Sequence, residues 1–119
     1  MSTTPQITRV ILYVKDVPRT AAFYERHFGL RPLPGGTDKW TELASPAGGC
    51  TVALHKASVA QKSGAAMKLV FGVEDVASFK AAKERDGLKF GVIHRVHGVD
   101  FANAKDPAGN PIQISNRGL

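Results

Sequence analysis

The feature that most constrains the fold is a strand–helix segment that occurs twice in the 119-residue chain. The first copy runs from Val10 to Leu30 and the second from Lys68 to Leu88. Six residues recur at one constant offset: Val14, Asp16, Val17, Ala22, Glu25 and Arg26 match Val73, Asp75, Val76, Ala81, Glu84 and Arg85. A repeat of about half the chain predicts a duplicated module, because solenoid repeats are shorter and more numerous.

Local signals in the first copy predict where its helix begins and ends. Asp16 can accept hydrogen bonds from free backbone N–H groups at a helix start, and Pro18 suits the first turn. Gly29 can adopt the left-handed conformation that ends a helix. Helical spacing places four apolar residues on one stripe, namely Val17, Ala21, Tyr24 and Phe28. His27 lies near the C-terminus of this helix, where a positive charge is favourable, and it is expected on the surface.

The remaining elements follow from apolar runs separated by turn residues. Strands are expected at Ile7–Val14, Leu30–Leu33, Lys39–Ala44, Cys50–His55, Met67–Val73, Val92–Val96, Val99–Ala104 and Pro111–Ser115, and helices at Pro18–Phe28 and Val76–Asp86. Ser45–Gly49 and Asp106–Asn110 are predicted turns, rich in residues that favour them. Lys56–Ala65 is small and polar and is interpreted as a linker.

This order, a strand, a helix and three strands repeated twice, predicts an α+β fold. Tandem βαβββ modules are expected to form a curved, mostly antiparallel sheet around a cavity, with the helices on the other face. One domain covers residues 1–119, with modules at about 6–56 and 66–116.

Composition narrows the possible functions. The formal charge is +6, but the basic residues are scattered and no basic run is interleaved with aromatic residues, so nucleic-acid binding is not expected. No apolar stretch approaches bilayer length, so no membrane partner is expected. The N-terminus shows no signal region, and the single Cys50 is predicted to be a half-buried packing residue. These features favour a cytoplasmic protein.

Two segments carry a resemblance to a known family. The first is the strand–helix segment containing Lys15-Asp16, Phe23-Tyr24 and Gly29-Leu30, and the second is Asp106–Ile114. With the element order, they resemble the vicinal-oxygen-chelate superfamily of glyoxalases, bleomycin-resistance proteins and extradiol dioxygenases. The resemblance covers nearly the whole chain, and it implies a small-molecule ligand and a homodimer.

The resemblance also implies four cavity-facing positions that hold a divalent metal in some members. Here those positions carry Arg9, Ala53, Lys68 and Gln113. Only Gln113 has a suitable donor atom, because Ala53 has none and the other two side chains are cations. We therefore expect no metal and no other cofactor.

The same positions suggest how a ligand is held. Strand parity predicts that the cavity face carries Arg9, Ile11, Tyr13, Ala53, His55, Lys68, Val70 and Gln113. Arg9 and Lys68 occupy equivalent positions and could grip a carboxylate or phosphate together. In the alternative, Arg9 pairs with Glu42 while Lys68 extends to solvent. Trp40 and Glu42 share one face of their strand, and parity alone does not decide which.

His55 is the best candidate for a general base, with Tyr13 as a second catalytic candidate, because imidazole titrates near neutral pH. His94 and His97 lie three apart near a strand end, which predicts opposite faces and an edge position.

Two main hypotheses follow. In the first, a metal-free cavity binds a small molecule, including an anionic one, as in the bleomycin-resistance branch. The ligand-binding residues would be Arg9, Tyr13, Trp40, His55, Lys68 and Gln113. In the second, the protein is a lyase, isomerase or dioxygenase of the same superfamily. It would use acid–base chemistry, or a displaced metal held by His55, His94 or His97 with Glu42.

Overall fold

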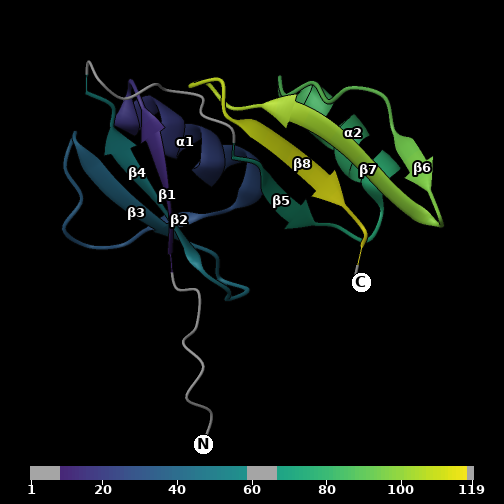
Figure 1. Cartoon of the computed structure of the whole chain (residues 1–119), viewed down its shortest axis with the longest axis horizontal. Helices are drawn as coiled ribbons and strands as arrows, with labels where there is room; N and C mark the ends of the chain where they lie inside the picture. The colour runs from purple at the N-terminus through teal and green to yellow at the C-terminus, as the bar shows by residue number, and fades with distance from the viewer. Residues whose placement is uncertain (1–8, 59–66, 118–119) are drawn as a thin grey trace, which may run out of the picture. The chain divides into compact units, whose positions relative to one another are not determined.

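The computed structural model describes residues 9–58 and 67–117 of a chain that divides into two compact units, Met1–Ser63 and Gly64–Leu119. We call them unit 1 and unit 2 (Figure 1). Unit 1 contains β1 (Arg9–Val14), α1 (Val17–Phe28), β2 (Arg31–Pro32), β3 (Trp40–Ala44) and β4 (Thr51–Lys56). Unit 2 contains β5 (Leu69–Gly72), α2 (Val76–Arg85), β6 (His94–Val96), β7 (Val99–Lys105) and β8 (Pro111–Ser115). The predicted α+β fold with two βαβββ modules is confirmed.

Each unit contains one open, four-stranded mixed sheet. The strand order is β1-β4-β3-β2 in unit 1 and β5-β8-β7-β6 in unit 2. The first strand of each unit pairs in parallel with the last, and the other two pairings are antiparallel. The parallel pairing is possible because the helix carries the chain across the sheet between the two strands.

The ends of α1 are fixed as the sequence predicts. The Asp16 carboxylate accepts a hydrogen bond from the Arg19 backbone N–H at 3.0 Å. At the other end Gly29 has φ 68° and its N–H donates to the Glu25 carbonyl, while the Leu30 N–H donates to Tyr24. This pair of bonds satisfies carbonyls that the helix leaves free, and only glycine adopts that conformation without strain.

The buried stripe of α1 differs from the predicted one at its C-terminal end. Val17, Ala21 and Tyr24 are buried as predicted, but His27 is buried in place of Phe28. His27 is 8% exposed and its ring packs against Phe23 at 4.9 Å. The prediction of a surface histidine was wrong because the α1 face that packs on β3 and β4 extends one residue further round the helix.

Helix α2 repeats the capping of α1 but buries less of itself. The Asp75 carboxylate accepts a hydrogen bond from the Ser78 backbone N–H at 3.0 Å. Val76 is the helix residue that is fully buried, whereas α1 buries five residues. Leu88 and Phe90, which follow the helix, supply further apolar contact, and Phe90 is only 2% exposed. Unit 2 therefore depends on residues just beyond its helix for much of its core.

The two predicted turns are closed by hydrogen bonds to the side chain of their first residue. The Asp106–Asn110 turn is closed by hydrogen bonds to the Asp106 side chain, whereas the corresponding Ser45–Gly49 turn uses Ser45. Cys50, at the end of the latter turn, is exposed, so its predicted half-buried packing role was wrong.

Within residues 9–58 and 67–117, neither helix is long and apolar enough to span a bilayer.

Candidate functional site

Each sheet presents one face to the helix of its own unit; we call the opposite face the open face. In unit 1 the buried residues Leu12 and Leu54 face α1. Alternation therefore places Arg9, Ile11 and Tyr13 on the open face, beside their cross-strand partners on β4. Trp40 pairs with His55 and Glu42 pairs with Ala53, which settles the orientation that the sequence left undecided. Trp40 and Glu42 lie on the open face.

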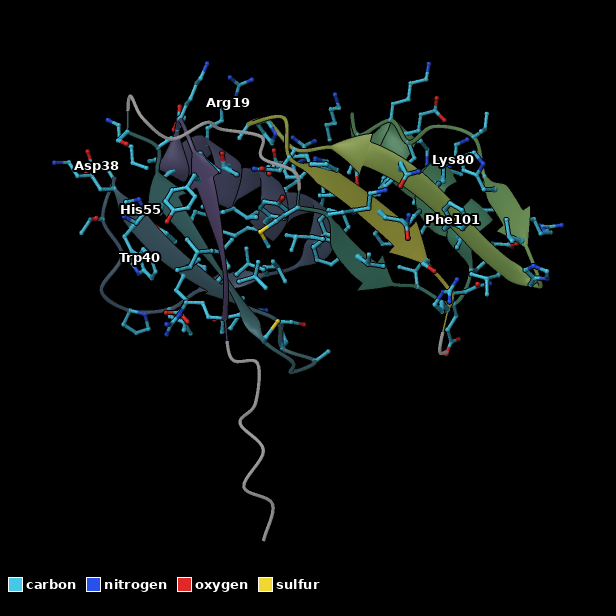
Figure 2. All side chains as sticks on the ribbon, in the orientation of Figure 1. Arg19, Asp38, Trp40, His55, Lys80 and Phe101 are labelled. Carbon is cyan, nitrogen blue, oxygen red and sulfur yellow. The ribbon has the colours of Figure 1, made fainter. Side chains whose placement is uncertain are left out.

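Tyr13, His55 and Trp40 form a continuous aromatic group across β1, β4 and β3, which we call the aromatic cluster. The Tyr13 and His55 ring centroids are 5.3 Å apart, and the Trp40 and His55 centroids are 5.9 Å apart and nearly perpendicular. Figure 2 shows Trp40 and His55 next to each other on this sheet. Three of the predicted site residues are thus brought together. His55 is exposed, so the cluster presents ring surface to solvent rather than to the core.

A backbone contact selects the tautomer of the neutral His55 ring. Its Nδ1 atom lies 2.8 Å from the Lys56 carbonyl oxygen. A carbonyl can only accept, so Nδ1 carries the proton in this contact and Nε2 of the neutral ring is an acceptor. The exposed nitrogen of the cluster can therefore accept a hydrogen bond or a proton.

Arg9 pairs with the Glu42 carboxylate of its own sheet, as the second of the two alternatives predicted. Its Nε donates to Glu42 Oε2 at 3.0 Å, and the Thr51 hydroxyl donates to the same oxygen at 2.6 Å. These hydrogen bonds, from Thr51 first and Arg9 second, lower the pKa of the Glu42 carboxyl. The pair is formally neutral, so Arg9 offers less attraction to an anionic ligand than an unpaired guanidinium would.

The lowered pKa predicts a pH-dependent contribution to stability. Because the folded-state pKa lies below the ordinary value of 4.5, the contribution is complete above that value and is lost as pH falls through the folded pKa. We expect Glu42→Gln to destabilise the protein near neutral pH, and the difference from wild type to shrink progressively in acid. Urea unfolding across that pH range measures it, with Glu74→Gln, at an exposed position, as control. A difference that stays constant with pH would contradict the prediction.

On the open face of unit 2, Lys68, Asn103 and Gln113 form what we call the amide cluster. Asn103 and Gln113 are cross-strand partners, and Gln113 Nε2 donates to Asn103 Oδ1 at 3.0 Å. Lys68 Nζ donates to the same oxygen at 3.4 Å, at the long end for a hydrogen bond. Lys68 therefore does not simply extend to solvent. Asn103 was not among the predicted site residues, although its distance from the predicted Asp106–Asn110 turn equals that of Gln113, which would have paired the two.

The remaining histidines occupy separate positions in unit 2. His94 lies on β6 and its ring stacks on Phe101 at 5.0 Å with an interplanar angle of 27°. His97 lies in the two-residue turn between β6 and β7 with φ 50°. Within residues 9–58 and 67–117, no group of three His, Cys, Asp or Glu side chains is arranged to hold a metal ion.

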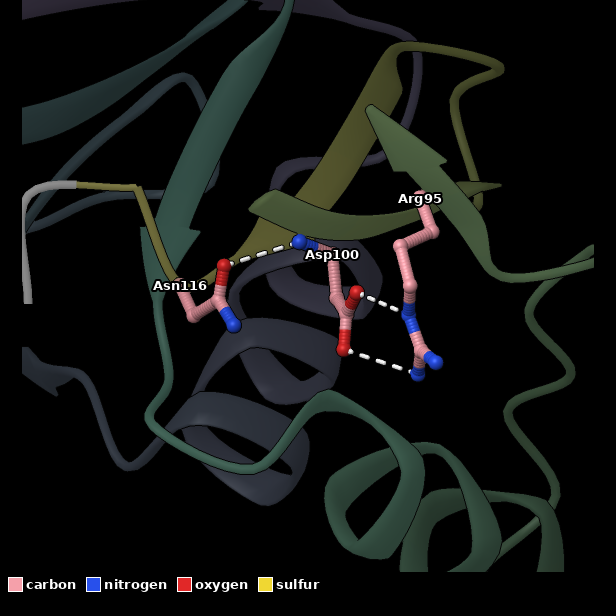
Figure 3. Close-up of polar contacts among 3 residues, drawn as sticks. All are labelled: Arg95, Asp100 and Asn116. Atoms are coloured by element: carbon pink, nitrogen blue, oxygen red, sulfur yellow. Dashed lines mark hydrogen bonds and ion pairs between the residues drawn. The ribbon is translucent and has the colours of Figure 1, made fainter. Parts of the chain in front are cut away.

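A second group of polar side chains in unit 2 connects neighbouring strands. Arg95 donates two hydrogen bonds to the Asp100 carboxylate, at 2.7 and 3.2 Å, and the Asp100 backbone N–H donates to Asn116 Oδ1 at 2.9 Å (Figure 3). The carboxylate raises the pKa of Arg95. Asp100 precedes the open-face residue Phe101 on β7, so its side chain lies on the opposite face of the sheet. On that face it links β6 to β7, while its backbone N–H links β7 to the residue that follows β8.

Comparisons with known proteins agree with this architecture. Residues 6–114 match the model of a family described as the Glyoxalase/Bleomycin resistance protein/Dioxygenase superfamily. No curated protein matches the sequence.

Similar solved structures support the fold. A lactoylglutathione lyase from Agrobacterium tumefaciens has a TM-score of 0.80 at 20% identity, covering 99% of this chain and 100% of the other. An antibiotic-binding protein from a Streptomyces species also has a TM-score of 0.80, at 19% identity, covering 96% and 97%. A possible glyoxalase from Bacillus cereus has a TM-score of 0.72 at 19% identity, covering 93% and 98%. At these identities the likeness concerns the fold.

Proposed function

The chain belongs to the Glyoxalase/Bleomycin resistance protein/Dioxygenase superfamily, and we propose that it binds a small molecule with a flat aromatic part. The observation that carries the proposal is the aromatic cluster of unit 1, whose rings contact one another on the sheet face opposite α1. Rings of this kind form the apolar surfaces of small-molecule sites, and His55 Nε2 adds a hydrogen-bond acceptor. The antibiotic-binding relative in fold is consistent with the proposal.

Two cationic side chains, Arg9 and Lys68, support anionic ligands as well. The Arg9–Glu42 pair is neutral, but Arg9 keeps a side-chain exposure of 44% and its terminal nitrogens remain available as donors. In unit 2 the partner of Lys68 is an uncharged amide, so the ammonium charge is not compensated there. We therefore extend the proposal to ligands that carry a carboxylate or phosphate.

The test uses the single tryptophan as a reporter. Trp40 is the only tryptophan of the chain, so its fluorescence responds to molecules that bind at the aromatic cluster. Titration with a panel of aromatic antibiotics and aromatic carboxylates should give saturable quenching by at least one compound. His55→Ala should then weaken binding about tenfold, or about 1.4 kcal/mol, because it removes the central ring and the acceptor.

The matched control is Lys39→Ala, which changes an exposed residue next to Trp40 without touching the cluster. It should leave the dissociation constant unchanged. The proposal fails if no compound in a broad panel quenches Trp40, or if His55→Ala and Lys39→Ala behave alike toward a compound that does.

The second candidate function is acid–base catalysis as a lyase or isomerase. It is favoured by the Nδ1 contact of His55, which leaves Nε2 as a base on an exposed face, with Tyr13 next to it. Conversion of lactoylglutathione, followed by the absorbance of its thioester, is a direct assay. Activity that disappears in His55→Ala, but persists in Lys39→Ala, would favour catalysis over binding.

We also propose that the function needs no divalent metal at the four positions that bind it in some family members. Arg9 and Lys68 are cations, Ala53 is a fully buried methyl group, and the Gln113 amide is hydrogen-bonded to Asn103. This set of residues does not fit a divalent cation, and no displaced set of three ligands occurs in the described residues. Zinc, nickel, manganese or a chelator should shift the melting temperature by less than about 1 °C, whereas binding of a metal would raise it. Stoichiometric metal in untagged protein would contradict the proposal.

A homodimer and a cytoplasmic location complete the proposal. The first strand of each unit, β1 or β5, is an edge strand of its own sheet, and edge strands are common places for a second chain to pair. The exposed Cys50 thiol suits a reducing compartment, where it would stay unmodified. Light scattering on purified protein measures the mass directly, and a monomer at micromolar concentration would refute the dimer.

A further inference from the structure

The open face of unit 1 changes in chemical character from one end of its strands to the other. The register of β1, β4 and β3 sorts its side chains into three successive rows. In order, the rows are Tyr13 with His55 and Trp40, then Ile11 with Ala53 and Glu42, then Arg9 with Thr51. The first row is the aromatic cluster, the second is apolar over β1 and β4, and the third begins with a cation.

A second arginine extends the third row. Arg31 on β2 pairs with Ala44 of β3, which follows Glu42 by two positions and therefore shares its open face. Continuing the observed pairing of β3 with β4 by one residue brings Ala44 level with Thr51. Arg31 is exposed and makes no ion pair within residues 9–58 and 67–117. We call Arg9, Thr51 and Arg31 the arginine row.

The arginine row is positively charged even when its neighbouring carboxylate is counted. Glu42 compensates the charge of Arg9, with which it pairs, but the charge of Arg31 remains. The Glu42 side chain is 18% exposed and its Oε2 atom already accepts from Arg9 and Thr51, whereas the Arg9 side chain is 44% exposed. A ligand that reaches this row therefore meets arginine N–H donors before it meets the carboxylate. Such donors match the oxygens of a carboxylate group.

The register also gives the separation between the aromatic cluster and the arginine row. Tyr13 and Arg9 are four residues apart on β1, so at about 3.3 Å per residue their Cα atoms are about 13 Å apart. The guanidinium of Arg9 reaches Glu42 of the middle row, which shortens the gap to about 10 Å. Within the gap Ile11 is 38% exposed and Ala53 contributes only a methyl group. An aromatic end and a cationic end are thus joined by an apolar stretch of sheet.

We infer that unit 1 binds an aromatic carboxylic acid in which an apolar spacer of about 10 Å separates the ring from the carboxylate. The ring would lie on the aromatic cluster and the spacer along Ile11 and Ala53. The carboxylate would accept hydrogen bonds from Arg9 and Arg31. The inference rests on the proposed function, which it narrows from any flat aromatic ligand to an acid of defined length.

Two simpler classes of ligand fit this face less well. A short aromatic acid such as phenylacetate cannot reach both ends at once, because an extended chain advances by only about 1.2 Å per bond. An aromatic ligand with a positive charge in place of the carboxylate would be repelled by Arg31, whose charge is uncompensated. A long acid meets all three rows with groups of matching chemistry.

The experiment uses ω-phenylalkanoic acids from phenylacetic to phenylundecanoic acid, each paired with its uncharged primary amide. Calorimetry on the full-length protein measures the dissociation constants, and quenching of Trp40 shows that the ring lies at the aromatic cluster. We expect the shortest acids to bind no better than their amides. Acids with about six to nine methylene groups should bind about tenfold more tightly than their amides, because their carboxylates reach the arginine row.

Arg31→Gln tests the arginine row without leaving Glu42 unpaired. It should reduce the preference for the long acids over their amides to less than about threefold, the part that Arg9 supplies. Binding of the amides should be unchanged, which shows that the variant remains folded. Arg19→Gln removes the same charge from an exposed position on α1 and is the matched control; it should preserve the preference.

The outcomes separate this inference from the proposed function. A preference for acids that is independent of spacer length, or that survives in Arg31→Gln, would overturn the inference. Failure of the whole series to bind would also overturn it, while the proposed function would stand as long as another aromatic compound quenches Trp40. If no aromatic compound quenches Trp40, the proposed function fails and the inference fails with it.

Discussion

Asp106→Ala should lower the free energy of unfolding by about 3 kcal/mol, measured by urea unfolding followed by far-UV circular dichroism. One carboxylate oxygen of Asp106 accepts from the backbone N–H groups of Ala108 and Asn110, at 2.9 and 2.8 Å. The other accepts from the Asn110 side-chain amide at 3.1 Å. Asp106 and Asn110 are 5% and 2% exposed, so alanine leaves the two buried Asn110 donors without their acceptor.

The duplicated turn of unit 1 supplies the control. Ser45 occupies the corresponding position, and its hydroxyl accepts from the Ala47 backbone N–H at 3.1 Å in an exposed setting. Ser45→Ala should cost less than about 1 kcal/mol, because water can replace the lost bond. Similar losses for the two variants would show that burial of the Asp106 turn has little energetic effect.

Phe90→Ala should have the largest effect, lowering the free energy of unfolding by about 4 kcal/mol. Phe90 is 2% exposed and packs against Phe79 of α2 at 6.4 Å between ring centroids. Because α2 itself fully buries only Val76, removal of Phe90 takes away much of the apolar contact that holds this helix to its sheet. Circular dichroism is the suitable readout, since the only tryptophan lies in the other unit.

Phe101→Ala is the matched control, because it removes the same side chain from the open face of the same unit. Its loss should stay below about 1.5 kcal/mol, mostly from the ring contact with His94. If the Phe101 variant were the less stable one, the assignment of core and open face in unit 2 would be wrong.

Most of the fold could be predicted because its signals are local. The caps at Asp16 and Asp75 and the Gly29 stop each act within one helical turn, and the structure confirms all three. The parallel pairing of β1 with β4 was not predicted, because it joins strands separated by a helix and two further strands. The burial of His27 was missed for a similar reason, since it depends on how far the sheet extends beneath α1.

The site was harder to predict because the face of a strand depends on its register. Alternation showed that Trp40 and Glu42 share a face, but a shift of one residue in the pairing of β3 with β4 would reverse it. The observed partners, Trp40 with His55 and Glu42 with Ala53, resolve it. Asn103 was missed because its importance lies in contacts with residues distant in the sequence.

The two sheets also show how a duplicated gene can diversify its product. Arg9 begins β1 and Lys68 lies just before β5, at the equivalent position of the repeat. Each donates a hydrogen bond to a residue two strands away, Glu42 in one copy and Asn103 in the other. Exchanging a carboxylate for an amide at this one position changes the local electrostatic potential from balanced to positive without altering the backbone. Each half can therefore evolve its own preference for charge, and a single codon at position 42 or 103 is enough to reset it.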